Sequence, residues 1–103
     1  MRYTECTSLG TRPSSLGAGT WSMAGKNAYG LVFGRADEAR PVETLRTLLD
    51  EGVNVIDTAP IYGMEGAAEK LVGRALQDGY HEKAFLVTKF GDYCDAATGA
   101  RVI

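Results

Sequence analysis

Three ionisable side chains stand where apolar runs of the sequence end. Asp57 closes the apolar run that starts at Val53, and Tyr62 follows five residues later, directly before a glycine. A second apolar run, residues 84–87, leads to Lys89. If both runs are strands of one parallel sheet, their carboxyl ends lie at the same edge, where ligands bind in α/β proteins. The pattern therefore predicts that Asp57, Tyr62 and Lys89 face one site.

A tyrosine beside a lysine can serve as an acid. A free phenol titrates near pH ~10, too high for easy proton exchange at neutral pH. An ammonium about 4 Å away is worth ~4 kcal/mol at an effective dielectric constant near 20. After desolvation is subtracted, this is enough to lower the pKa of Tyr62 by about one unit or more. Asp57 would pair with Lys89 and reduce the cost of burying either charge.

Such a trio is suited to protonating a carbonyl oxygen while a hydride reaches the carbon. The spacing also permits a purely structural interpretation. In that case Asp57 caps a helix, Lys89 is an edge residue with a packed apolar stem, and Tyr62 packs in a loop.

Alternating strand and helix patterns surround these residues. The first twenty residues predict a small hairpin and then a strand near residues 15–19, followed by an irregular loop over 22–36. Strands are predicted at 53–59 and 83–89, and their continuous apolar character is typical of strands covered on both faces. Two amphipathic helices precede these strands. Their aligned apolar residues are Val42, Leu45, Leu48 and Leu49 in the first, and Ala68, Leu71, Val72, Ala75 and Leu76 in the second.

This alternation predicts a parallel α/β fold, either an open doubly wound sheet or a barrel. A dinucleotide-binding open sheet requires G-x-G-x-x-G after the first strand. Residues 17–22, "GAGTWS", lack the third glycine. The dinucleotide fingerprint is therefore absent.

Size and composition narrow the classes of function. The chain has 103 residues, so residues 1–103 form one small domain at most. A net charge of −2 gives no basic field for nucleic acid or an anionic membrane. No apolar run approaches the ~18 residues of a membrane helix. Cys6 and Cys94 are far apart with no nearby histidine, which indicates no metal site. A soluble cytoplasmic protein is the expectation.

Four segments, "LGAGTW", "GVNVIDTAPIYG", "EKLVGRAL" and "FLVTKFG", occur in this order over residues 8–91. Together they resemble the aldo-keto reductase superfamily, and the D-T-A-x-x-Y-G block followed by a strand ending in T-K is the most specific part. The resemblance implies an N-terminal hairpin and about three βα units of a (β/α)8 TIM barrel. It also implies an NADP(H)-dependent oxidoreductase that reduces an aldehyde or ketone, with a small carbonyl or alcohol as its substrate.

Residue by residue, the resemblance makes Asp57, Tyr62 and Lys89 three members of a catalytic tetrad. Tyr62 would be the acid, Lys89 would lower its pKa, and Asp57 would hold the lysine. Asp57 and the loop residues Thr20 and Trp21 would lie against the nicotinamide end of the cofactor. The fourth family residue is a histidine on the next strand. His81 precedes residues 83–89, so it is expected at the opposite end of the barrel.

The sequence stops at Ile103, after three of the eight expected strands. This departure leaves alternatives to a complete reductase: a non-catalytic barrel segment that binds or regulates a partner, or a truncated product inactive by itself. Three strands cut from a barrel would also expose sheet edges, through which copies of the chain could associate.

Overall fold

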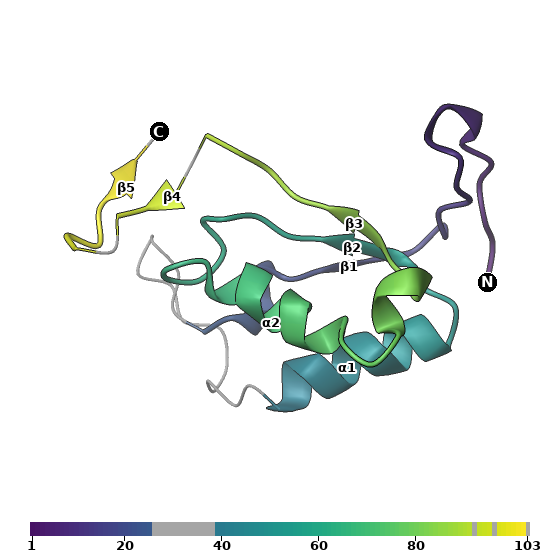
Figure 1. Cartoon of the computed structure of the whole chain (residues 1–103), viewed down its shortest axis with the longest axis horizontal. Coiled ribbons are helices and arrows are strands. Elements are labelled where there is room, and N and C mark those ends of the chain that lie inside the picture. The colour runs from purple at the N-terminus through teal and green to yellow at the C-terminus, as the bar shows by residue number, and fades with distance from the viewer. Residues whose placement is uncertain (26–38, 92, 96, 103) are drawn as a thin grey trace.

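The expected alternation of strands and helices is present in the computed structural model, which describes residues 1–25, 39–91, 93–95 and 97–102 (Figure 1). Strands β1 (Gly17–Gly19), β2 (Val55–Asp57) and β3 (Phe85–Val87) form a parallel sheet in the order β1-β2-β3. Helix α1 (Ala39–Asp50) precedes β2, and helix α2 (Ala67–Ala75) precedes β3. The strand order along the sheet is thus the order along the chain.

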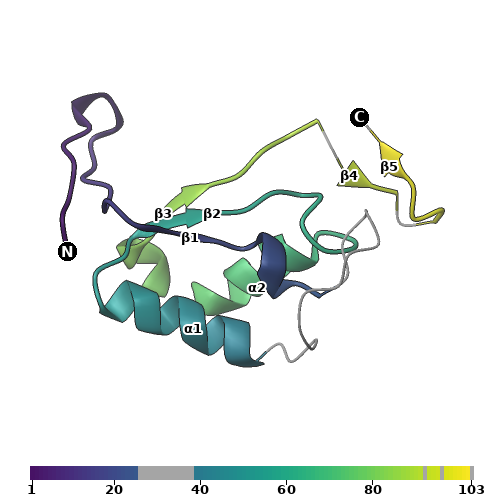
Figure 2. The same ribbon diagram turned by 180° about the vertical axis from the view of Figure 1, so that it is seen from behind.

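Both helices lie on the same face of this sheet, as the two opposite views show (Figures 1 and 2). A doubly wound sheet would have helices on both faces and a reversal of strand order. Strands in chain order with helices on one face are the arrangement from which a barrel is built. The predicted partial barrel is therefore confirmed over the open sheet.

Shorter elements complete the described chain. The N-terminal hairpin is held by antiparallel bridges, Tyr3 to Ser14 and Cys6 to Thr11, and so confirms the expected hairpin. Three single-turn 3-10 helices are η1 (Thr7–Leu9), η2 (Trp21–Met23) and η3 (Tyr80–Lys83). Most of the loop predicted at 22–36 lies outside the described residues.

The sequence did not predict the hairpin of β4 (Tyr93–Cys94) and β5 (Arg101–Val102). Its turn is organised by Asp95, whose Oδ1 accepts hydrogen bonds from the N–H groups of Ala97 and Thr98 at 3.0 and 2.8 Å. Gly99 then takes a positive φ of 70°. An aspartate followed by a glycine is a turn signal, but the flanking strands are too short to show an alternating pattern.

Helix α1 ends through its backbone at Gly52. Its φ of 96° lies in a region that favours glycine. The N–H of Gly52 donates to the carbonyl of Leu49 at 3.1 Å, and the N–H of Val53 to that of Leu48 at 3.0 Å. This pair of bonds is a Schellman motif, which satisfies the last carbonyls of a helix. Val53 and β2 can therefore follow almost at once.

Arg46 joins the two helices. Its Nε donates to the carbonyl of Ala75 at 3.0 Å, and its guanidinium also reaches the carbonyls of Arg74 and Gln77. A cation at the C-terminal end of α2 satisfies free carbonyls and complements the helix dipole. The packing of α1 on α2 is thus fixed by a polar contact as well as by apolar burial.

The core lies between the sheet and the helices. Ile56, at the centre of β2, is 1% exposed, and its neighbour in the register on β1, Ala18, is also buried. The apolar residues expected on the helices face this core, which comprises Ala18, Leu45, Leu49, Ile56, Leu71, Val72, Ala75 and Leu76.

Coverage of both sheet faces was predicted from the apolar runs, and the described structure differs. Leu86 pairs with Ile56 across β2 and β3 but is 45% exposed. Ala18 of β1 and Ile56 of β2 belong to the core cluster formed with α1 and α2, whereas Leu86 of β3 is not part of that cluster. The strands are also shorter than predicted, because pairing stops at Asp57 and Val87.

Candidate active site

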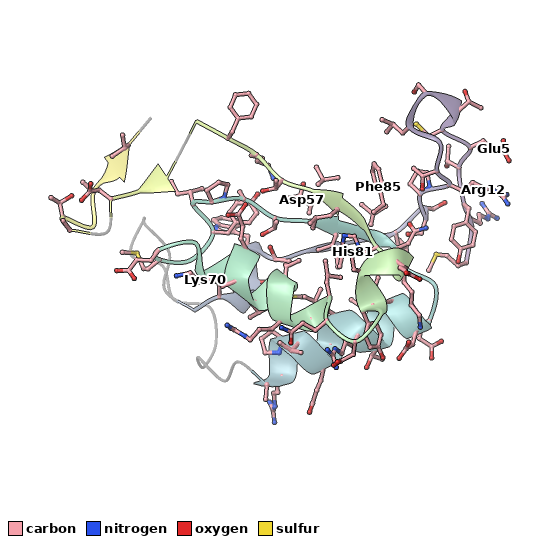
Figure 3. All side chains as sticks on the ribbon, in the orientation of Figure 1. Glu5, Arg12, Asp57, Lys70, His81 and Phe85 are labelled. Carbon is pink, nitrogen blue, oxygen red and sulfur yellow. The ribbon has the colours of Figure 1, made fainter. Side chains whose placement is uncertain are left out.

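Asp57 and Lys89 meet at the carboxyl end of the sheet. Asp57 is the last residue of β2, and strand alternation places it on the face opposite to Ile56, away from the helices (Figure 3). Lys89 follows β3 by two residues, and its Nζ lies 2.7 Å from Oδ1 of Asp57. The expected ion pair is therefore present. Both side chains are about half exposed, so the pair can be reached from solvent.

The same ammonium has a second acceptor, because Nζ of Lys89 also donates to the carbonyl of Thr58 at 2.9 Å. Sequence reasoning missed this contact, since a backbone carbonyl leaves no signature in residue types. With two acceptors, the ammonium is fixed in direction, and its positive charge is balanced by the carboxylate of Asp57.

Tyr62 lies beside this ammonium. Nζ of Lys89 is 4.9 Å from the centroid of the Tyr62 ring, within the range of a cation–π contact. The hydrogen bond to Asp57 is the largest cause that raises the pKa of Lys89. The Tyr62 phenol raises it further, and partial burial opposes both. Lys89 therefore keeps its positive charge at neutral pH, next to an aromatic hydroxyl.

The loop after β1 is tied to Asp57. Thr20 is fully buried, and its N–H and its hydroxyl both donate to the carbonyl oxygen of Asp57, at 3.0 and 3.1 Å. The Thr20 side chain is thus turned into the protein, where it fixes the start of η2. Trp21 comes next, and its ring centroid lies 6.4 Å from that of Tyr62. The indole is 44% exposed and forms a wall beside the phenol.

Gly63 allows the Tyr62 loop to pack closely. Its φ is 74°, and a Cβ at this position would lie 2.8 Å from the Cβ atoms of both Ala24 and Ala67. Those two residues belong to the end of the η2 segment and to the start of α2. A side chain here would separate the Trp21 and Tyr62 segments, which explains the glycine after the tyrosine.

Other residues considered from the sequence lie elsewhere. His81 is exposed in η3, ahead of β3, and so lies at the amino end of the strand as predicted (Figure 3). A hollow of about 320 Å³ is lined by Cys6, Arg12 and other residues of the N-terminal hairpin, also remote from Lys89. Among the described residues, no three His, Cys, Asp or Glu side chains are grouped to hold a metal ion.

Comparison with known proteins identifies the family. The model of the Aldo/keto reductase family matches residues 15–102. The chain belongs to this family. It is 39% identical over 90 residues to the aldo-keto reductase YhdN of Bacillus subtilis (strain 168), an alignment that covers 86% of the chain and 25% of that relative. It is 36% identical over 78 residues to the NADH-specific methylglyoxal reductase of Escherichia coli (strain K12), covering 76% of the chain and 23% of the relative.

Solved structures agree with the family. The crystal structure of an aldo/keto reductase from Klebsiella pneumoniae, in complex with NADP and acetate, superposes with a TM-score of 0.65 and 33% identity. This match covers 80% of the chain and 25% of the solved one. The described fold therefore corresponds to the N-terminal part of an aldo-keto reductase barrel. The chain spans about a quarter of the length of the curated relatives it matches. In the described ranges, no helix is both long enough and apolar enough to cross a bilayer.

Proposed function

We propose that this aldo-keto reductase chain contributes the acid end of an active site that reduces an aldehyde or ketone with NADP(H). Tyr62 is the general acid, Lys89 supplies positive charge, and Asp57 holds the lysine. The observation that carries the proposal is the placement of one ammonium between a carboxylate 2.7 Å away and a phenol ring 4.9 Å away. A small carbonyl or alcohol is the substrate, and a location in the cytoplasm stays a prediction.

The donor set at this edge fits the nicotinamide end of the cofactor. Trp21 and Tyr62 present flat aromatic surfaces that are partly exposed. The Asp57 carboxylate is 44% exposed, and a carboxylate can accept more hydrogen bonds than the one from Lys89. Thr20 supports this end indirectly, by holding the Trp21 segment on the carbonyl of Asp57. When bound, the nicotinamide supplies the hydride.

The chain's own residues then handle the proton. As the carbonyl carbon gains a hydride, Oη of Tyr62 gives its proton to the carbonyl oxygen, and an alcohol results. Negative charge develops on the phenolic oxygen, where the Lys89 ammonium stabilises it. Asp57 keeps that ammonium charged and directed, because a salt-bridged lysine with a raised pKa retains its proton. Solvent restores the proton to Tyr62, whose side chain is partly exposed.

The test is Tyr62→Phe in the intact barrel, assayed with methylglyoxal as the carbonyl probe and with NADPH and NADH in parallel. We expect turnover to be abolished while nucleotide affinity stays within a few-fold, because the hydroxyl donates a proton and adds little to binding. The matched control is Tyr3→Phe, which removes the same hydroxyl from a tyrosine of the N-terminal hairpin, where it donates to the carbonyl of Gly52. Turnover of Tyr62→Phe within tenfold of the unaltered protein would remove Tyr62 from the role of acid.

A further inference from the structure

The backbone that carries Lys89 lies beyond the paired part of the sheet. Strand β3 ends at Val87, whose carbonyl accepts a hydrogen bond from the N–H of Thr58 at 2.8 Å. Lys89 follows two residues later, yet its ammonium is held by Asp57 and Thr58. Fixing a lysine side chain costs up to ~2 kcal/mol of rotamer entropy, so its backbone must be well placed for the contact to form.

Thr88 provides a restraint on the opposite face. Leu86 pairs with Ile56, and residues 86 and 88 both alternate toward the helices. Oγ1 of Thr88 donates to Oε1 of Glu69 at 2.7 Å, a length typical of a hydroxyl bound to a carboxylate. Glu69 stands in the first turn of α2, where the helix dipole favours an acidic side chain.

The same turn of α2 also holds Tyr62. The N–H of Ala68 donates to the carbonyl of Tyr62 at 3.0 Å, and Ala68 is fully buried. Neighbouring residues of one helical turn, Ala68 and Glu69, therefore bind the segment with the phenol and the segment with the ammonium. The first turn of α2 therefore restrains the position of both the phenol and the ammonium.

We propose that Glu69, acting through Thr88, is a positioning residue that sets where the Lys89 ammonium lies relative to Asp57 and Tyr62. Its catalytic consequence rests on the proposed function, whereas its effect on the geometry of Lys89 does not. Glu69 touches neither the ammonium nor the phenol in this arrangement. It acts by fixing the residue before Lys89, on the helix side of the sheet.

The test uses side-chain ¹⁵N-lysine NMR, with Lys89→Arg to assign the signal, and follows the titration of Lys89. Asp57 and Tyr62 are the groups that raise its pKa. In Glu69→Ala and in Thr88→Val we expect the titration midpoint of Lys89 to fall toward that of an ordinary lysine, because its ammonium moves away from Asp57 and Tyr62. Glu69→Gln and Thr88→Ser should retain the raised midpoint, because an amide oxygen can accept and a serine hydroxyl can donate the same bond. Glu43→Ala, an exposed glutamate of α1, is the matched control and should change nothing.

Kinetics separate this proposal from the proposed function. In the intact barrel, Glu69→Ala should lower kcat about tenfold, equivalent to about 1.4 kcal/mol, with KM little changed. An unchanged Lys89 midpoint in Glu69→Ala and Thr88→Val would overturn the positioning role, even if both variants lose stability. A lowered midpoint with normal kcat would support the positioning role and instead count against Tyr62 and Lys89 as the acid machinery.

Discussion

Three glycines in and beside α2 allow the packing at the site to be measured by the same substitution. Gly63 has a positive φ and no room for a Cβ, Gly66 has a positive φ of 71° with nothing within 4 Å, and Gly73 is helical with nothing within 4 Å. Replacement by alanine therefore tests backbone strain together with crowding at Gly63, backbone strain alone at Gly66, and neither effect at Gly73. All three variants add the same methyl group.

The expected changes in the free energy of unfolding differ in sign as well as in size among the three variants. Gly73→Ala should stabilise the protein by about 0.5–1 kcal/mol, because alanine favours a helix interior more than glycine does. Gly66→Ala should cost about 1–2 kcal/mol for a left-handed residue with a side chain. Gly63→Ala should cost this plus about 1–3 kcal/mol of overpacking, since the new Cβ meets Ala24 and Ala67 at 2.8 Å.

Urea unfolding with linear extrapolation measures these differences, and an unchanged m-value shows that the unfolded states are comparable. Gly63→Ala should also reduce the energy transfer or quenching between Trp21 and the Tyr62 loop, because relief of the contact moves the two segments apart. A Gly63→Ala variant as stable as Gly66→Ala, with unchanged tryptophan emission, would refute the close packing that the structure assigns to Gly63.

Four further outcomes are expected. In the intact barrel, Lys89→Met should lower turnover and shift the apparent pKa of the acid in its pH profile upward, because the charge beside the phenol is gone; an unchanged profile would mean that Lys89 and Tyr62 are not coupled. The 103-residue chain should bind NADPH weakly in a fluorescence titration, since the nucleotide phosphates need arginine partners that the resemblance places in later barrel units; micromolar binding would contradict this. Asp50→Asn should lower the free energy of unfolding at neutral pH and make that free energy depend less on pH in the acid range. The hydrogen bond from Lys83, then that from Tyr80, lowers the pKa of Asp50, so this stability is present above pH ~4 and is lost on acidification; equal urea midpoints of both proteins at pH 7 would exclude it. The outer edges of β1 and β3, each with β2 as its neighbour in the described sheet, should promote self-association in sedimentation runs; a sharp monomer with strongly protected strand amides would show otherwise.

The sequence by itself determined the elements and the chemical types at the site. Helix periodicity located the buried Leu45 and Leu49 correctly, and the apolar runs before Asp57 and Lys89 located β2 and β3. These features are local: hydrophobic spacing and a helix-ending glycine act within a few residues. Parallel pairing then brings strand ends to one edge, which is why the ion pair of Asp57 and Lys89 could be expected.

Tertiary structure alone decided the contacts that depend on two distant segments. The Thr20 hydroxyl turned onto the carbonyl of Asp57, the bond of Thr88 to Glu69, and the crowding around Gly63 have no local pattern, because each depends on how one layer is placed over another. The exposure of Leu86 was also decided by tertiary structure. Its apolar type predicts burial, but burial requires packing partners, and Ile56 has them in the core cluster with α1 and α2 whereas Leu86 is not part of that cluster. Residue type states a preference, and the packing of elements far apart in the chain determines whether it is satisfied.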